Sequence, residues 1–173
     1  MKNLVLYLKE ATANPFATHR PTTKKELREI IEERIKKEGP NCDLNDIDVS
    51  QITDMHALFV GSPFNGDISH WDVRNVKDMS MMFNDSAFSG DLNEWDVTNV
   101  EDMSEMFEEC MFNGKIGDWD VRNVKNMKEM FYAAGYFNQD ISKWEISDDC
   151  NTTDMFRNAV IEEEFKPKAL QQK

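Results

Sequence analysis

Apolar residues recur with a period of about 24 residues between Cys42 and Ala159. Within one unit they lie at positions i, i+3, i+5, i+8, i+11, i+14 and i+15. The aromatic residues form three columns: Trp71, Trp95, Trp119 and Trp144; Phe59, Phe83, Phe107, Phe131 and Phe156; and Phe64, Phe88, Phe112 and Phe137. A repeat of this length indicates stacked supersecondary units, because one unit cannot bury its apolar face alone.

The spacing within a unit predicts short strands and turns. Trp71 and Val73 alternate as in a strand, whereas the later spacing of three fits turns, 3₁₀ geometry or short strands at a corner. No unit is long enough to hold the two helices of a helical repeat. We therefore expect the Trp, Met and Phe columns to form the core. One extra residue lies within Tyr132–Tyr136, which predicts a loop there.

A different pattern precedes the repeats. Residues from Pro21 to Glu38 predict an amphipathic helix, in which Thr23 and Glu26 have the spacing of a capping box. One face is apolar and contains Leu27, Ile30, Ile31 and Ile35. Gly39-Pro40 predicts the end of the helix. We expect this helix to cover the open end of the first coil.

These patterns divide the chain into three parts. Residues 1–40 hold an N-terminal segment and the capping helix, residues 41–159 hold four to five repeats, and residues 160–173 form a charged tail that we expect to fray. Near the start, Leu4, Val5, Leu6 and Leu8 fit a short strand.

Two columns of acidic residues need an explanation, since stacked carboxylates about 4.8 Å apart repel by about 0.9 kcal/mol in water. The columns are Asp48, Asp72, Asp96, Asp120 and Glu145, and Asp54, Asp78 and Asp102. The interpretation we favour is that each carboxylate accepts hydrogen bonds from backbone N–H groups two or three residues on. The alternative is a ladder of calcium or another hard cation. The amides of Asn75, Asn99 and Asn123 are expected to satisfy backbone groups.

Composition and charge exclude several classes of function. The net charge of −13 and the pI near 4.6 argue against binding to nucleic acid or to an anionic membrane. No stretch approaches 18 apolar residues. The apolar run Leu4 to Leu8 is shorter than the core of a signal peptide, so we expect a cytoplasmic protein, with the cell surface as the alternative. Cys42, Cys110 and Cys150 fall at different phases of the repeat and are interpreted as reduced structural cysteines.

No catalytic motif is present in the sequence, and the protein is not expected to be an enzyme. There is no glycine-rich phosphate loop, no Gly-x-Ser-x-Gly and no His-Glu-x-x-His. His56 and His70 occupy variable columns of the repeat. We therefore assign no catalytic residue, no cofactor site and no metal site.

The repeat unit resembles a known family. FNGDISHWDVRNVKDMSMMF and FSGDLNEWDVTNVEDMSEMF are similar to the BspA-like bacterial surface leucine-rich repeat, a mycoplasma-type repeat of unknown function, over about residues 41–159. The resemblance implies a leucine-rich-repeat-like right-handed solenoid with short parallel strands. It also implies roles in adhesion or protein recognition. Many members of this family are exported or lipid-anchored.

Three functions are compatible with these observations. We favour a non-enzymatic module that binds a protein partner, such as an intracellular inhibitor or adaptor. The first alternative is an exported adhesion protein of the cell surface. The second alternative is an acidic mimic of nucleic acid that blocks a nucleic-acid-binding protein.

The partner-binding surface is expected at variable positions, because the columns form the core and the turns. One candidate set flanks the Val-x-x-Met-x-x-Met-Phe segment and contains Arg74, Lys77, Met81, Glu101, Glu105, Arg122, Lys125 and Glu129. The rival surface is the loop series Asn84–Ala87, Glu108–Met111 and Tyr132–Tyr136, with Met111, Tyr132 and Tyr136 as its candidates. Interfaces are enriched in Tyr and Met, but packing at the edge of the core is an equally good interpretation of these three residues.

Overall fold

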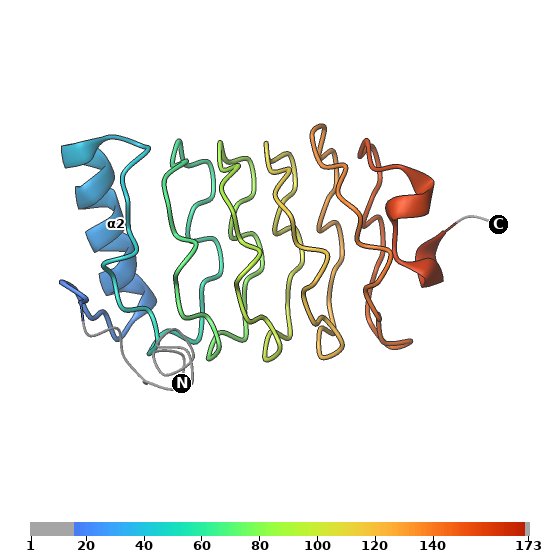
Figure 1. Ribbon diagram of the computed structural model, residues 1–173, viewed down its shortest axis with the longest axis horizontal. Helices are drawn as coiled ribbons and strands as arrows, with labels where there is room; N and C mark the ends of the chain where they lie inside the picture. The colour runs from blue at the N-terminus through green and yellow to red at the C-terminus, as the bar shows by residue number, and fades with distance from the viewer. Residues whose placement is uncertain (1–15, 172–173) are drawn as a thin grey trace, which may run out of the picture.

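The computed structural model describes residues 16–171, so the expected strand near Leu4 and the apolar run Leu4 to Leu8 lie outside the described residues. The described chain forms a row of coils stacked side by side (Figure 1). Helix α2, Lys24–Glu38, lies at one end of the row. Two short 3₁₀ helices, η1 (Glu163–Phe165) and η2 (Lys168–Leu170), lie at the other end.

The prediction of a leucine-rich-repeat-like right-handed solenoid with short parallel strands is wrong. Residues 16–171 contain no β-strand, and the β-pairing between neighbouring coils in this range consists of isolated parallel bridges between single residues. Four of these bridges follow one column, Asp54, Asp78, Asp102, Asn126 and Asn151, and another pairs Asp43 with Asp67. Among residues 16–171, 3₁₀ helices occur only after the last repeat, as η1 and η2.

Each coil has an ascending segment, defined as residues 79–85 and their equivalents, and in the first four coils alternate N–H groups of this segment donate to carbonyl groups of the next coil. In the second coil the donors are the N–H groups of Met79, Met81, Phe83 and Asp85. Their acceptors are the carbonyl groups of Asp102, Ser104, Met106 and Glu108 in the next coil, at 2.8–3.0 Å. All the N–H groups of this row therefore face the C-terminal side of the stack.

Left-handed residues explain why the ascending segments are not strands. Met81 and Asp85 have φ angles of 56° and 51°, whereas a parallel strand needs φ near −120°. Local turns accompany them, because Met82 N–H donates to the Met79 carbonyl and Ser86 N–H donates to the Phe83 carbonyl, each at 3.2 Å. The apolar spacing is therefore produced by turns, which recur in every coil.

The predicted core is confirmed for the Trp, Met and Phe columns. All four Trp side chains are at most 4% exposed, and the phenylalanine rings of successive coils stack, as Phe83 does on Phe107 at 5.7 Å. Each indole Nε1–H also donates to a backbone carbonyl of the preceding coil; Trp95, for example, donates to Ile68 at 3.0 Å. The Trp column thus joins neighbouring coils as well as filling the space between them.

Hydrogen bonds confirm the predicted roles of the Asp and Asn columns. Asp78 Oδ1 accepts from Ser80 N–H at 2.9 Å, and Asp102 Oδ1 accepts from Ser104 N–H at 2.8 Å. Asn99 Nδ2 donates to the Arg74 carbonyl at 2.8 Å, and the equivalent amides of the neighbouring coils do the same. Turn capping therefore satisfies these carboxylates locally.

The predicted N-terminal helix is confirmed and covers the end of the first coil. It begins at Lys24, later than Pro21, because Thr23 is extended and its hydroxyl accepts the Glu26 N–H at 3.2 Å. Leu27 and Ile31 are buried in the common core. Gly39, with φ of 91°, ends the helix, and its N–H donates to the Ile35 carbonyl at 2.9 Å.

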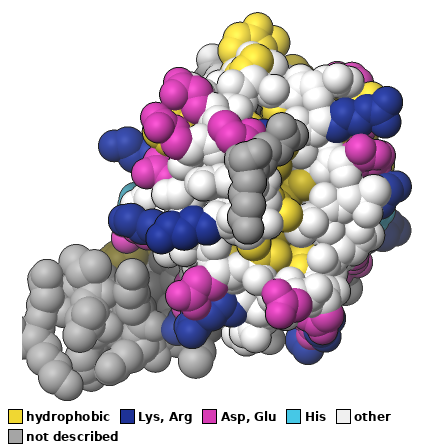
Figure 2. All heavy atoms as spheres, turned by 90° about the vertical axis from the view of Figure 1, so that its right-hand side faces the viewer, with side chains coloured by type: hydrophobic (Ala, Val, Ile, Leu, Met, Phe, Trp, Pro, Cys, Tyr) yellow, Lys and Arg dark blue, Asp and Glu magenta, His cyan; other side chains and the backbone are white. Residues whose placement is uncertain are grey.

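The expectation that the C-terminal segment frays is wrong for residues 160–171. Ile161 is 7% exposed and belongs to the core, and Pro167 is buried. The Phe165 carbonyl accepts the Ile141 N–H at 2.9 Å, so this segment stacks on the last coil at Ile141. Figure 2 shows this end face, with hydrophobic side chains at its centre and charged side chains around them.

Candidate functional site

Five of the residues expected to bind a partner form ion pairs with Asp72, with Asp120 or with one another, and a sixth, Glu129, pairs with Lys128. Arg74 Nη2 lies 2.8 Å from Asp72 Oδ2, and Arg122 Nη2 lies 2.6 Å from Asp120 Oδ2. These hydrogen bonds hold the pKa of the Asp72 and Asp120 carboxyl groups below their usual range. Both arginines are therefore partly neutralised by their own coil.

The other three form a ladder across successive coils. Glu101 lies between Lys125 and Lys77, with N–O distances of 2.6 Å and 3.2 Å. The hydrogen bonds of Lys125 and then of Lys77 lower the pKa of the Glu101 carboxyl group. This ladder holds two positive charges and one negative charge, and exposed pairs of this kind contribute little to stability.

Met81, Glu105 and Glu129 are equivalent residues of successive coils and are all left-handed, with φ angles of 55–57°. Their side chains are half-buried. Lys128 Nζ pairs with Glu129 at 3.1 Å, and the described residues contain no ion pair to Glu105. Glu105 and Glu129 therefore mark an acidic part of the surface, which Met81 adjoins.

This acidic part extends to the following turn. We define the acidic patch as Glu105, Glu108, Glu109 and Glu129. Burial, and then repulsion from Glu105, Glu129 and Glu109, raise the pKa of the Glu108 carboxyl group, although Asn84 Nδ2 donates to it at 2.8 Å. Of the four carboxylates in the patch, Glu108 accepts the Asn84 amide and Glu129 pairs with Lys128.

We expect Glu108→Gln to raise the free energy of unfolding at pH 7. An acid whose pKa is raised in the folded state destabilises that state when it is ionised, and stability recovers as the pH falls through the folded pKa. The gain should therefore disappear below the unfolded pKa of about 4.3. Urea unfolding at pH 7 and pH 4 measures it, with Glu94→Gln as the exposed control. A gain of equal size at both pH values would contradict this prediction.

An apolar ridge lies next to the acidic patch. It consists of the residue before each member of the second Phe column, Pro63, Ala87, Met111 and Tyr136, and of Val160, which precedes Ile161 one coil further on. The exposed fractions of Met111, Tyr136 and Val160 are 52%, 61% and 52%. These turns lie at the upper ends of the coils in Figure 1, and hydrophobic side chains protrude at the top of Figure 2. The extra residue of the fourth repeat falls in this turn.

Tyr132 does not belong to this ridge. Its side chain is half-buried, and the Arg157 guanidinium lies over its ring, 6.0 Å from the centroid. The loop series therefore separates into exposed residues, Met111 and Tyr136, and a residue at the edge of the core, Tyr132.

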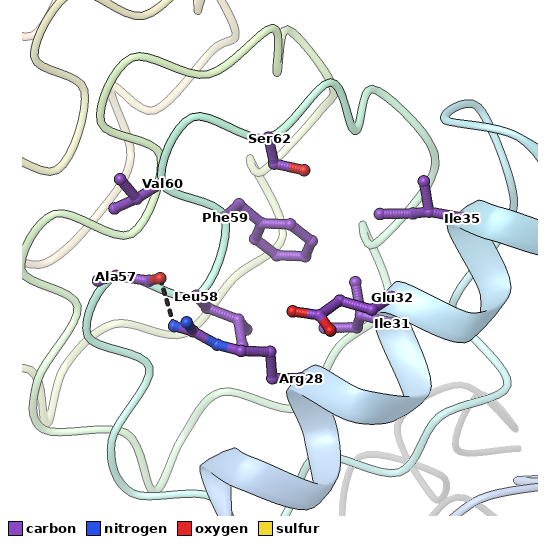
Figure 3. A pocket seen from close by; sticks show the side chains of 9 residues that line it. All are labelled: Arg28, Ile31, Glu32, Ile35, Ala57, Leu58, Phe59, Val60 and Ser62. Atoms are coloured by element: carbon purple, nitrogen blue, oxygen red, sulfur yellow. Dashed lines mark hydrogen bonds between the residues drawn. The ribbon is translucent and has the colours of Figure 1, made fainter.

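A hollow of about 440 Å³ lies between α2 and the first coil (Figure 3). Leu58, Phe59 and Ile31 form its apolar wall, and Glu32 extends toward them from the helix. The Arg28 guanidinium donates to the Ala57 carbonyl at 2.6 Å across one side. This hydrogen bond joins the helix to the first ascending segment.

Residues 16–171 contain no group of three or more His, Cys, Asp or Glu side chains that could hold a metal ion. In the same range no helix is long and apolar enough to cross a bilayer. The three cysteines are free, and burial raises the pKa of the Cys110 thiol.

These features define a protein of stacked coil repeats, closed by a helix at its N-terminal end. A family model matches residues 26–111 and again residues 86–167. The chain therefore belongs to the family described as "Mycoplasma protein of unknown function, DUF285". No curated protein and no solved structure matches the chain.

Sequence reasoning found Met111 and Tyr136 but missed the ridge as a whole. Pro63, Ala87 and Val160 were not recognised, although an alignment on the second Phe column places an apolar residue before it in every coil. The left-handed residues were also missed, because most of them are not glycine.

Proposed function

We propose that this protein is a non-enzymatic module that recognises another protein through the apolar ridge. The observation that carries the proposal is the alignment of exposed apolar side chains along successive coils, led by Met111 and Tyr136. Contiguous apolar surface of this kind marks interaction sites, and interfaces are enriched in Met and Tyr. The finer resemblance to BspA-like surface repeats, which implies protein recognition, also supports the proposal.

The ion-paired surface is a weaker candidate. A partner that bound Arg74, Arg122 or the Lys77–Glu101–Lys125 ladder would first have to break hydrogen bonds made within the chain. The ridge has no such cost at Met111, Tyr136 and Val160, because these side chains are apolar and already exposed.

The two alternatives receive less support from the geometry. Mimicry of nucleic acid needs outward-facing acidic columns, and many of those carboxylates accept hydrogen bonds from their own coil. Adhesion at the cell surface could use the same ridge and differs in the place where the protein acts. Fractionation of native cells distinguishes adhesion from the cytoplasmic role that we favour.

Affinity capture from native cells tests the proposal with two matched double variants. Met111→Lys/Tyr136→Lys places two charges in the ridge, whereas Phe16→Lys/Val60→Lys places two charges at exposed apolar residues outside it. We expect a stoichiometric partner that the wild type and the control retain and the ridge variant loses. Thermal melting verifies that all three proteins are folded. Equal retention by both variants would overturn the proposal.

A further inference from the structure

We propose that the C-terminal end of the stack binds an ascending segment of another protein chain, which would add one more row of hydrogen bonds to those between the coils. The site is the donor edge, defined as the backbone N–H groups of four residues in the last coil: Thr152, Asp154, Phe156 and Asn158. The proposal does not use the apolar ridge, so it can fail while the proposed function stands, and the reverse.

The donor edge lacks the hydrogen bonds that each equivalent edge within the stack makes. Its equivalents in the fourth coil are the N–H groups of Met127, Glu129, Phe131 and Ala133. These four groups donate to carbonyl groups of the last coil at 2.8–3.0 Å. Within residues 16–171 the donor edge itself has no acceptor. Its four residues are exposed or half-buried, so the edge is open to a partner.

The donor edge offers N–H groups only. The carbonyl groups of Thr152, Asp154 and Phe156 each accept the N–H group three residues on, at 3.1–3.2 Å. The carbonyl groups of the residues between them accept N–H groups of the fourth coil. A partner that satisfies the whole edge therefore has to present a row of carbonyl groups, as each ascending segment does to the coil before it.

This polarity excludes three other occupants. A β-strand presents both N–H and C=O groups along its edge, so part of that edge would set donors against donors. A symmetric dimer through this edge would do the same, because both copies contribute the same surface. A second copy in the form seen here cannot offer its first coil, since α2 lies beside that segment and Arg28 donates to the Ala57 carbonyl (Figure 3). The occupant that fits is an ascending segment whose carbonyl row is not covered by a helix.

The end of the core adds an apolar contact to the donor edge. In the column that begins with Phe59, successive rings stack at 5.4–5.7 Å as far as Phe156. The Lys166 ammonium lies over the Phe156 ring, 5.8 Å from its centroid. Hydrophobic side chains are visible at the centre of this end face in Figure 2. A bound ascending segment would continue the column by placing a Phe ring on Phe156 and displacing the flexible Lys166 side chain.

Amide hydrogen exchange, measured for each residue of the full chain by NMR, tests the proposal. The probe is a peptide with blocked ends and the sequence of residues 76–88, which contain the ascending segment of the second coil. Without peptide, we expect the donor edge to exchange at least about ten times faster than its equivalents in the fourth coil. An excess of the peptide should slow the donor edge at least about tenfold, and a peptide of the same composition in scrambled order should not.

Any of four results would overturn the proposal. Slow exchange of the donor edge without peptide would show that the edge is already covered. Slowing that depends on protein concentration alone would identify a second copy as the occupant. No slowing by either peptide, or equal slowing by both, would show that the edge does not recognise an ascending segment.

Two variants assign the peptide to this end of the stack. Phe156→Leu keeps an apolar side chain in the last coil but removes the ring on which the peptide would stack, so binding should weaken about fivefold. Slow exchange of the Glu129 and Phe131 N–H groups verifies that the last coil of this variant is folded. The ridge variant Met111→Lys/Tyr136→Lys should bind the peptide as the wild type does. Unchanged affinity in Phe156→Leu, or lost affinity in the ridge variant, would place the peptide elsewhere and overturn the proposal.

Discussion

A Phe107→Ala variant is expected to lose about 3–5 kcal/mol of unfolding free energy. The Phe107 side chain is fully buried, and its ring centroid lies 5.7 Å from that of Phe83, 5.6 Å from that of Phe131 and 4.2 Å from that of Phe112. Removing the ring leaves a cavity between coils that hydrogen bonds hold at a fixed spacing. Urea unfolding followed by the fluorescence of the buried tryptophans measures the loss.

Phe156→Ala is the matched control in the last coil. Phe156 belongs to the same column, but it is half-buried and has one phenylalanine neighbour, Phe131, at 5.6 Å. The loss of unfolding free energy for Phe156→Ala should be about half as large as for Phe107→Ala, because the half-buried ring removes less apolar area from water on folding. Equal losses at Phe107 and Phe156 would show that stacking on both sides does not determine the stability of this column.

Gly66→Ala is expected to destabilise the protein by about 3 kcal/mol through a steric clash. A Cβ atom at this position would lie 1.9 Å from the Cys42 carbonyl oxygen and 2.8 Å from the ring of Phe64. The carbonyl belongs to the backbone and cannot rotate away as a side chain does. The coil would have to separate from the chain beside it, which thermal and urea unfolding would both detect.

Gly61→Ala separates this steric effect from backbone strain. Gly61 is left-handed, with φ of 62°, and no atom lies within 4 Å of its added Cβ. The substitution should cost about 1 kcal/mol, the usual penalty of a left-handed residue with a side chain. The equivalent residues Asp85, Glu109, Ala133 and Asn158 have φ angles of 50–61°, so the fold tolerates side chains there. A larger loss at Gly61 than at Gly66 would contradict this account.

The periodicity of the sequence predicted which residues are buried, but it did not predict the backbone that buries them. Apolar residues such as Met79, Met82 and Phe83 face the core whether they lie on a strand or in consecutive turns. The difference lies in the φ angles of Met81 and Asp85, which are positive without glycine. Hydrogen bonds to the neighbouring coil accompany these angles. The propensity of a single residue carries no information about such contacts.

Local chemistry was easier to predict. Thr23 and Glu26 identified the start of the helix, and the Asp and Asn columns were assigned to backbone capping, because these side chains bond to groups only a few residues away or one coil away. The ion pair between Asp72 and Arg74 is also local, yet its two members were assigned to different roles. The prediction treated Asp72 and Arg74 separately and did not consider that two opposite charges so close in the sequence can pair.

The candidate site could be predicted only in part. Met111 and Tyr136 were found by residue type, whereas Tyr132 was grouped with them although Arg157 covers its ring. Exposure separates these three tyrosine and methionine side chains, and exposure depends on the direction of each turn. The ridge as a continuous surface follows from the stacking of the coils.

The amides of the ascending segments that donate between coils all point toward the C-terminal end, which gives these rows an electric direction. Aligned peptide groups add their dipoles, as they do in a helix, with the positive pole on the N–H side. The C-terminal end is therefore the positive pole, and the acidic residues Glu162, Glu163 and Glu164 lie there. At the negative pole, Arg28 of α2 donates to the Ala57 carbonyl, and Lys24 pairs with Asp54 at 2.8 Å. Two basic side chains of α2 thus bind groups at the carbonyl pole, and a run of three acidic residues lies at the N–H pole.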